Sequence, residues 1–487
     1  MRRILFLLGS AIAVLVVFTV VLTAWYDSPQ QQVAEAGGIG VRAGAVERLT
    51  DAIRIPTISA EDPALFDAGA FRTFHEYLWT AFPHVHARLE RETVANHSLL
   101  YRWQGTDPTL KPILLSGHMD VVPAELETEG KWEHDPFAGD VAEGFIWGRG
   151  AIDNKSAVLG TLEAVEMLLD EGFRPARTIY LAFGHDEEVG GTHGARQTAA
   201  LLKSRGVELE MVLDEGGVIG SGILPGIVEP VALVGVAEKG FVTIELRTRV
   251  PSGHSSLPPS QSAVGIVSAA VARLEANPMP ARLEGATRGL FDRIGPHFPL
   301  VQRAVVANLW LTRAIVTRRL ASSPATNAMV RTTTAATMFQ AGTKDNVLPS
   351  SARAVVNFRI LPGDSVSTVL DHVRRVVDDD RVDIKTVGRF SAEPSAMTST
   401  ASDSFRTLEH AIRRVAPDVI VAPYLVVVVT DARHYADLSR NVFRFLPIRF
   451  TSRDLERMHG IDERIGIREY QGAIRTYRQL LIDFTEK

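Results

Sequence analysis

The sequence predicts an α/β fold, a doubly wound and mainly parallel sheet with an inserted α+β domain. Strands that alternate with helices predict a sheet covered on both faces, which binds ligands at the carboxyl ends of its strands. The helical run SAVLGTLEAVEMLLDEG places apolar side chains on one face and ends at Gly172. Three apolar runs end in polar residues and glycine, as expected for strands that feed a site: PILLSGHMDVV, TIYLAFGHDEEVGG and VELEMVLDEGG.

The pattern of apolar and polar residues changes near Gly240. GFVTIELRTRV and ARAVVNFRILPGDS alternate apolar and polar residues, which is typical of strands with one open face. We therefore predict an inserted α+β domain over residues 239–388, flanked by the two parts of the main domain at 45–238 and 389–487.

The amino terminus is strongly apolar. Arg2 and Arg3 precede an uncharged run from Ile4 to Ala24, which is long enough for a transmembrane helix, and two aromatic residues follow it. Residues 1–26 are therefore predicted to be a membrane anchor that leaves the rest of the chain outside the cytoplasm. The alternative is a cleaved signal peptide and a secreted protein. Residues 27–44 are polar, rich in glycine and aperiodic, as in a linker.

A second apolar run, LVQRAVVANLWLTRAIVTRRL, lies within residues 281–330 and carries four arginines. We expect it to be a core helix or a cover over an apolar substrate chain. A helix that lies on a membrane surface is the alternative.

Charge and composition exclude several classes of site. The net charge of −5 gives no reason to expect a nucleic-acid partner. The chain has no cysteine, so disulfides, zinc–thiolate sites and cysteine nucleophiles are absent, and a metal would need His and carboxylate ligands. Ser255 and Ser256 do not sit in the G-x-S-x-G turn of a serine nucleophile.

Five short runs supply metal-seeking side chains. Two imidazoles with several carboxylates are a typical donor set for two cations that share an activated water. Because adjacent residues cannot share one geometry, we assign Glu188 to metal and Glu187 to the general base. The spacing does not choose between Asp214 and Glu215. The candidates are His118, Asp120, Asp153, Glu187, Glu188, Asp214, Glu215 and His459.

Two further residues could act on a substrate. His254, in PSGHSS, could donate a hydrogen bond to a developing oxyanion. Arg359, in NFRILPG, could bind a substrate carboxylate with two parallel hydrogen bonds, although a surface arginine of a sheet is an equal alternative.

From about residue 45 to the end, the chain resembles peptidase family M20, a group of di-zinc hydrolases. It is most similar to the branch of Gly-X carboxypeptidases and N-acyl-amino-acid hydrolases. Two runs depart from that branch. Asp153-Asn154 stands where two aspartates are usual, and VTDARHY replaces a G-T-D-S-R type of loop. The matching runs are GHMDVVP, WGRGAIDNK, DEEVGG, LDEGG, TKDNVLPSSARAVVNFRILPGD, TDARHY and MHGIDERI.

The resemblance implies two zinc ions, for which cobalt or manganese could substitute. Asp153 would bridge the two ions, His118 and Asp214 would complete one site, and Glu188 and His459 would complete the other. Glu187 would be the general base and acid, and Asp120 would support His118.

The inserted domain would be the lid or dimerisation domain of a homodimer. His254 would reach the partner subunit's active site, and Arg359 and Asn346 would contact the substrate. The expected function is hydrolysis of an amide bond next to a free carboxylate, in short peptides or N-acyl amino acids. The alternative is a catalytically silent binding protein on the same fold.

Overall fold

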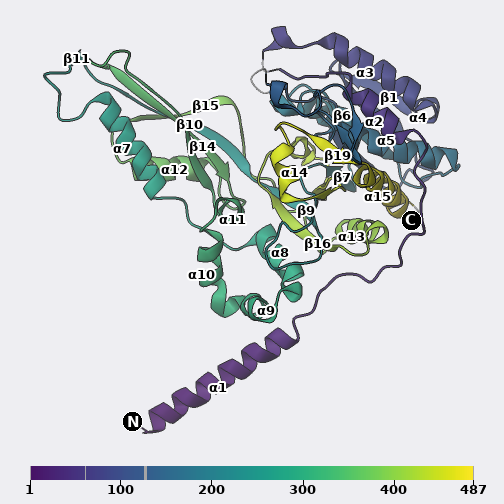
Figure 1. Cartoon of the computed structure of the whole chain (residues 1–487). Helices are drawn as coiled ribbons and strands as arrows, with labels where there is room; N and C mark the ends of the chain where they lie inside the picture. The colour runs from purple at the N-terminus through teal and green to yellow at the C-terminus, as the bar shows by residue number, and fades with distance from the viewer. Residues whose placement is uncertain (1, 61, 126–128, 486–487) are drawn as a thin grey trace.

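The computed structural model describes residues 2–60, 62–125 and 129–485 (Figure 1). Its main body is built on a ten-stranded mixed sheet with the order β1-β2-β6-β3-β7-β17-β9-β8-β18, in which β16 also pairs with β9. The central β6, β3, β7 and β17 run parallel, and β1 and β2 join antiparallel at one edge. The α/β prediction is therefore confirmed. The strands are β1 Glu90–Val94, β2 Ser98–Trp103, β3 Ile113–His118, β6 Ile179–Gly184, β7 Met211–Asp214, β8 Ile219–Gly220, β9 Val231–Glu238, β16 Ile420–Val426, β17 Val442–Arg444 and β18 Arg449–Phe450.

Helices cover both faces of this sheet, and α5 lies at the centre of the larger apolar core. The sequence pattern predicted one apolar face for α5, but the structure buries every residue from Lys155 to Leu168. The reason is that α2, α4, α15 and the sheet surround this helix. The helices of the main body are α2 Ala45–Ile53, α3 Ala68–Ala81, α4 Pro83–Arg88, α5 Lys155–Asp170, α6 Ala195–Ser204, α13 Asp403–Val415, α14 Ser452–Arg457 and α15 Ile467–Thr485.

Short elements complete the main body. A small antiparallel sheet brings the carboxyl-terminal segment next to the loop before α5. Its strands are β4 Val141–Ala142, β5 Phe145–Trp147 and β19 Arg464–Gly466. The 3₁₀ turns of the chain are η1 Pro63–Leu65, η2 Glu129–Lys131, η3 Glu187–Val189, η4 Gly295–His297 and η5 Asp431–Tyr435.

A second body projects from the first and has its own apolar core (Figure 1). Its four-stranded antiparallel sheet has the order β12-β14-β10-β15, and α7 and α12 pack on it. Burial alternates along β10, as the sequence pattern predicted. The exact domain boundaries at 239 and 388 stay a prediction. The elements are β10 Gly240–Arg249, β11 Gly253–His254, α7 Ala263–Ala276, β12 Thr333–Ala341, β13 Val347–Leu348, β14 Ser351–Ile360, α12 Val366–Val377 and β15 Asp383–Ala392.

Four helices lie beneath the inserted sheet: α8 Gly285–Ile294, α9 Leu300–Ala307, α10 Leu309–Leu320 and α11 Pro324–Val330. Between residues 300 and 320, only Val306, Asn308 and Leu309 are buried. The expectation that this run is a core helix is therefore wrong.

The amino-terminal run forms one helix, α1, over Arg2–Ala24. Among the residues that the structure describes, no helix combines the length and the hydropathy that crossing a bilayer requires, so the predicted transmembrane helix is not supported. The predicted linker contains no helix or strand from residue 27 to 42, but it is attached to the main body. The Gln30 side chain exchanges two hydrogen bonds with the backbone of Val421 in β16.

Candidate metal centre

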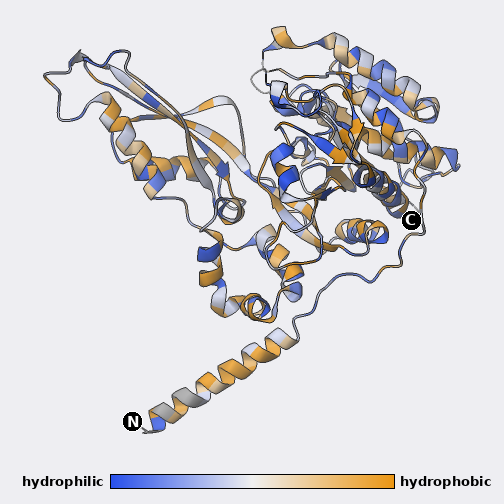
Figure 2. Cartoon of the chain, in the orientation of Figure 1, coloured by the Kyte–Doolittle hydropathy of each residue, from blue (hydrophilic) through white to orange (hydrophobic). Residues whose placement is uncertain are grey.

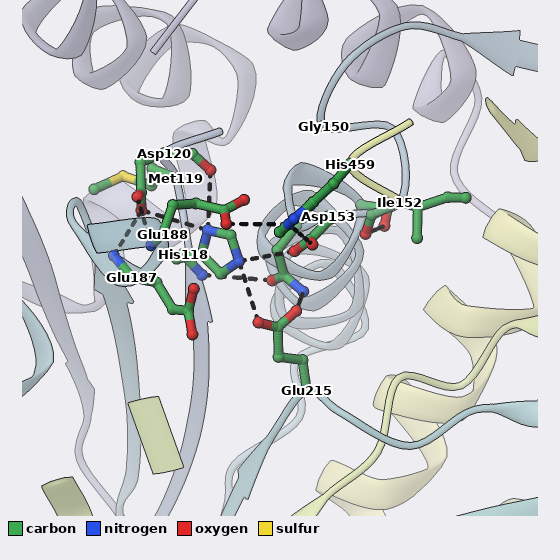
Figure 3. A network of polar contacts seen from close by, with 12 residues as sticks. His118, Met119, Asp120, Gly150, Ile152, Asp153, Glu187, Glu188, Glu215 and His459 are labelled. Carbon is green, nitrogen blue, oxygen red and sulfur yellow. Dashed lines mark hydrogen bonds and ion pairs between the residues drawn. The ribbon is translucent and has the colours of Figure 1, made fainter. Parts of the chain in front are cut away.

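The predicted site lies at the carboxyl ends of neighbouring parallel strands, as the sequence indicated. His118 is the last residue of β3, and Glu187 and Glu188 follow β6 in the turn η3. Asp214 ends β7, and Glu215 is the next residue. Two loops, one before α5 and one after α14, bring Asp153 and His459 to the same place (Figure 3).

Asp153 joins the two histidines through its two carboxylate oxygens. Oδ1 lies 3.0 Å from Nε2 of His118, and Oδ2 lies 3.0 Å from Nε2 of His459. Glu188 lies on the His459 side of Asp153, and its Oε2 is 3.1 Å from the same Nε2 of His459. One carboxylate shared by two imidazoles is the arrangement expected of a ligand that bridges two cations.

The third side chain near His118 is Glu215. Its Oε1 lies 3.2 Å from His118 Nε2, and its Oε2 accepts a hydrogen bond from the Asn154 amide. Asp214 is also buried, but its Oδ2 has no hydrogen-bond partner in the described part of the chain. The structure thus brings Glu215 to His118, which departs from the ligand set with Asp214 that the resemblance implied. Strand β7 ends at Asp214, so the adjacent side chains of Asp214 and Glu215 point in different directions.

Asp120 orients both His118 and the Glu187–Glu188 turn. Nδ1 of His118 lies 2.9 Å from the Asp120 carbonyl oxygen and 3.4 Å from its Oδ1. Nδ1 is thus held by Asp120, which leaves Nε2, facing Asp153 and Glu215, as the nitrogen that would bind a metal. The backbone amides of Glu187 and Glu188 donate to the two carboxylate oxygens of Asp120 at 3.2 and 3.1 Å.

Glu463 is a buried residue of this site that the sequence reasoning did not single out. Its Oε1 accepts hydrogen bonds from the amides of Gly150, Ile152 and Asp153 at 2.9–3.1 Å. Its Oε2 pairs with Arg149 at 2.6 Å, and both side chains are nearly inaccessible. Arg149 in turn donates to the carbonyl oxygens of residues 459 and 460. One carboxylate thus ties the Asp153 loop to the His459 loop.

The glycines after Glu188 permit a close approach of a second buried acid, Asp431. Gly190 and Gly191 have φ values of +107° and +63°, which favour glycine. A Cβ on Gly191 would collide with the carboxylate of Asp431. Both oxygens of Asp431 lack a hydrogen-bond partner among the described residues, and burial, followed by the nearby Asp214, raises the pKa of this group well above its usual range. Asp431 comes from the TDARHY run, which drew attention in the sequence only as a motif.

The pKa values of Glu187, Glu188 and Glu215 are raised because these carboxyl groups are buried close to one another. Burial, together with the charge of Asp153, raises the pKa of Glu188 to about 7 and that of Glu215 to about 8. Burial also raises the pKa of Glu187 well above its usual range. Hydrogen bonds that His459 donates to Asp153 and Glu188 raise the pKa of His459 to about 10. Carboxylates so crowded and buried need positive charge beside them to ionise at neutral pH.

The donor set fits divalent cations. Two groups of side chains, His118–Glu187–Glu215 and His118–Asp153–Glu188, each offer ligand atoms within 4.8 Å of one another. Oε1 of Glu188 is buried and has no hydrogen-bond partner in the described residues, as expected of an oxygen that serves a metal. Imidazole nitrogen and carboxylate oxygen without thiolate suit zinc and similar ions.

Three predicted substrate residues lie outside this cluster. His254 is exposed in β11 at the far end of the inserted body, and its Nδ1 lies 2.8 Å from Oγ of Ser256 (Figure 1). The backbone of Asn346 accepts a hydrogen bond from Ser255 in the same ribbon. Arg359 lies in β14 with its guanidinium 4.8 Å from the centre of the Phe241 ring. Their roles toward a substrate stay predictions.

We expect Glu463→Gln to weaken zinc binding by about 10- to 100-fold, because Glu463 holds the loop that presents Asp153. The affinity can be measured by competition with a chelating dye. Glu456→Gln is the matched control, since Glu456 is exposed in the preceding helix. Equal affinities for the two variants would contradict the role given to Glu463.

The choice between Asp214 and Glu215 can be tested in the same way. Glu215→Gln is expected to lose about one metal equivalent per chain, because of these two residues it is Glu215 that lies beside His118 Nε2. Asp214→Asn is expected to keep its metal. Metal analysis of the two purified variants decides the question, and a larger loss in Asp214→Asn would restore the ligand role that the resemblance gave to Asp214.

Comparisons with known proteins agree with this geometry. The chain is 44% identical over 445 residues to a probable carboxypeptidase S-like 2 of Dictyostelium discoideum, covering 91% of this chain and 85% of that protein. It is 41% identical over 443 residues to an N-fatty-acyl-amino acid synthase/hydrolase of Xenopus tropicalis, with coverage of 90% and 86%. The branch suggested by the sequence is thereby confirmed.

Solved structures share the fold. The M20 family metallo-carboxypeptidase of Sulfolobus solfataricus matches with a TM-score of 0.66 at 17% identity, over 90% of this chain and 99% of the other. Human carnosine dipeptidase 1 matches with a TM-score of 0.62 at 16% identity, over 91% and 96%. The family model described as peptidase family M20/M25/M40 matches residues 114–483. The chain belongs to this peptidase family.

Proposed function

We propose that this protein is a two-zinc hydrolase that cleaves the amide bond of N-acyl amino acids or short peptides next to a free carboxylate. The observation that carries the proposal is Asp153, whose two oxygens lie 3.0 Å from the two histidines. A single carboxylate between two imidazoles is suited to holding a pair of cations in one site.

The donor atoms divide into two sets around Asp153. His118 and Glu215 would hold one zinc, and His459 and Glu188 would hold the other. When bound, zinc supplies Lewis acidity and lowers the pKa of a water toward about 7. The His459 backbone has a φ of +61°, a conformation that costs about 1–3 kcal/mol and is usually kept where function requires it.

We assign Glu187 to proton transfer rather than to metal because Glu188 takes the position at His459. Asp120 fixes its backbone, and the site keeps its side chain half-buried. Its carboxylate would accept a proton from the attacking water and deliver it to the leaving amine. The elevated pKa of Glu187 suits this exchange, since a carboxylate with an ordinary pKa would be a weaker base toward the attacking water.

The substrate class follows from the relatives. Proteins of 44% and 41% identity are named carboxypeptidase S-like and N-fatty-acyl-amino acid synthase/hydrolase. Both names describe substrates with an amide bond next to an amino-acid carboxylate. His254, Asn346 and Arg359 lie on the inserted body, and we propose that they reach the substrate in a homodimer or after the two bodies close.

A panel of N-acyl amino acids with short and long acyl chains, together with dipeptides, tests the proposal. We expect hydrolysis of at least one class, loss of activity with a chelator, and recovery with zinc. Methyl esters of the same substrates are the matched control, since they lack the free carboxylate and should react poorly. Equal turnover of the esters would contradict the proposed recognition. The silent binding protein has no support, because the side chains expected to hold metal and move the proton are all present: His118, Asp153, Glu187, Glu188, Glu215 and His459 (Figure 3).

We further propose that α1 attaches the enzyme to a membrane, with the catalytic body outside the cytoplasm. The helix begins with two arginines and carries exposed apolar side chains over most of its length, among them Phe6, Val14 and Phe18. A protein that stays in the membrane fraction after carbonate washing supports this proposal. Release into the supernatant, as for a secreted protein with a cleaved signal, would contradict it.

A further inference from the structure

A second apolar surface lies beside the carboxyl end of α1. The amide of Asn308 donates to Thr23 Oγ1 and to the Thr19 carbonyl oxygen at 3.2 and 3.3 Å. The rings of Phe18 and Trp310 meet edge to face, with centroids 5.7 Å apart. These contacts join α1 to the junction of α9 and α10 (Figure 1). Whatever surrounds the carboxyl half of α1 must therefore lie next to α9 and α10.

Helices α9 and α10 expose large apolar side chains to solvent. The exposed fractions are 74% for Leu300, 77% for Val301, 55% for Trp310, 53% for Leu311 and 69% for Ile315. Large exposed apolar side chains gathered on two adjoining helices are a mark of a surface that interacts with another molecule. The exposed residues of α1 extend this surface, and Figure 2 shows α1 as apolar along most of its length.

The charge of the same helices has one sign. Residues 300–320 contain four arginines and no acidic residue, and residues 2–24 contain two arginines and no acidic residue, although the whole chain has a net charge of −5. Among the described residues, no ion pair engages Arg313, Arg318 or Arg319 of α10. Unpaired arginines beside apolar and aromatic side chains suit the headgroup region of an anionic membrane.

A hollow beside α10 adds to this match. It has a volume of about 590 Å³ and lies between α10 and the segment before α8. Arg282, Arg313, Arg318 and Arg331 line it together with Trp310, and Glu284 is its one acidic residue. Arg282 is paired with Asp364, which leaves Arg313, Arg318 and Arg331 to face a negatively charged group.

We propose that α9 and α10 form a binding surface, here called the seat, for the headgroups of an anionic membrane. It lies next to the place where α1 meets that membrane. The exposed apolar residues would enter the boundary between headgroups and acyl chains, and the arginines would contact lipid phosphates. The enzyme would then contact the membrane through both α1 and the α9–α10 surface. This proposal goes beyond the proposed hydrolysis and does not depend on it.

The absence of cysteine makes the test specific. Leu311→Cys in the full chain can be labelled with an environment-sensitive fluorophore and mixed with phosphatidylcholine vesicles that contain phosphatidylglycerol. We expect a blue shift and quenching by acyl-chain nitroxide lipids. Leu257→Cys is the matched control, because Leu257 is 83% exposed near the far end of the inserted body, and it should show neither effect. Hydrolysis by each labelled variant reports that it is folded.

The arginines and the helix α1 are tested separately. Replacing Arg313, Arg318 and Arg319 with Gln should weaken the vesicle-dependent signal at residue 311 by at least about tenfold, since each basic residue contributes severalfold to such binding. Val14→Cys reports insertion of α1. A shift at residue 14 without one at residue 311 would overturn the seat while leaving the α1 proposal intact. A fluorescence shift at residue 311 that appears at high protein concentration without lipid would overturn the lipid proposal. It would mean that a second copy of the chain covers α9 and α10.

Discussion

Glu187→Gln is expected to lower kcat by about 10²- to 10⁴-fold, the usual contribution of a general base, while zinc content stays unchanged. Gln has nearly the same shape and can keep the backbone contacts of the turn to Asp120. It cannot accept a proton from water or return one to the amine. The measurement is steady-state hydrolysis of the best substrate together with metal analysis of the same sample.

Two features make this prediction specific to Glu187. The adjacent Glu188 lies 3.1 Å from His459, so its loss should reduce the zinc content as well as kcat. Glu208→Gln serves as a control, because Glu208 is an exposed carboxylate that pairs with Lys111 at 2.9 Å. If Glu187→Gln kept full turnover, or lost its zinc, the assignment of general base and ligand within the pair would be wrong.

The pH profile should follow the same residue. Glu187 must be ionised to accept a proton, and burial raises its pKa above the usual carboxyl range. Activity should therefore fall as the pH drops through that raised pKa, and it should return as the pH rises. Bound zinc adds positive charge, which moves the acidic limb toward lower pH, so a metal-saturated enzyme should stay active to lower pH than one with partial metal content.

The residues that the sequence placed well are those at strand ends. His118 and the Glu187–Glu188 pair each follow an apolar run, and parallel strands bring their carboxyl ends together. The sequence could not separate Asp214 from Glu215, because a one-residue change at a strand end reverses the direction of the side chain. In the structure Glu215 lies 3.2 Å from His118, and which of the two residues binds metal stays a prediction.

Glu463 and the α9–α10 surface illustrate two other limits. The role of Glu463 rests on three backbone amides more than 300 positions earlier in the chain, and a pattern of side chains does not report such contacts. The α9–α10 run is apolar enough to be predicted as core, yet hydropathy alone does not say whether another part of the chain covers it. In the structure little does, and Leu311 and Ile315 remain exposed.

Asp153→Asn is expected to disrupt both metal positions at once. The carboxylate offers one oxygen to each histidine side, whereas the amide of Asn has one oxygen and one NH₂ group, which cannot bind a cation. We therefore expect fewer than two zinc ions per chain, zinc affinity lower by at least about 100-fold, and loss of nearly all turnover. Asp437→Asn is the control, because Asp437 is an exposed carboxylate that pairs with Lys203 at 2.6 Å.

Thermal unfolding separates the loss of metal from a general loss of stability. Zinc at 100 times its Kd stabilises the folded state by about 2.7 kcal/mol, so the parent protein should show a clear rise in Tm when zinc is added. Asp153→Asn should show little rise. Without metal, the substitution also weakens the contacts of residue 153 with His118 and His459, so the zinc-dependent rise in Tm is compared rather than Tm itself. An equal zinc-dependent rise in Tm for parent and variant would mean that Asp153 does not join the two cations, and the two-metal centre would have to be abandoned.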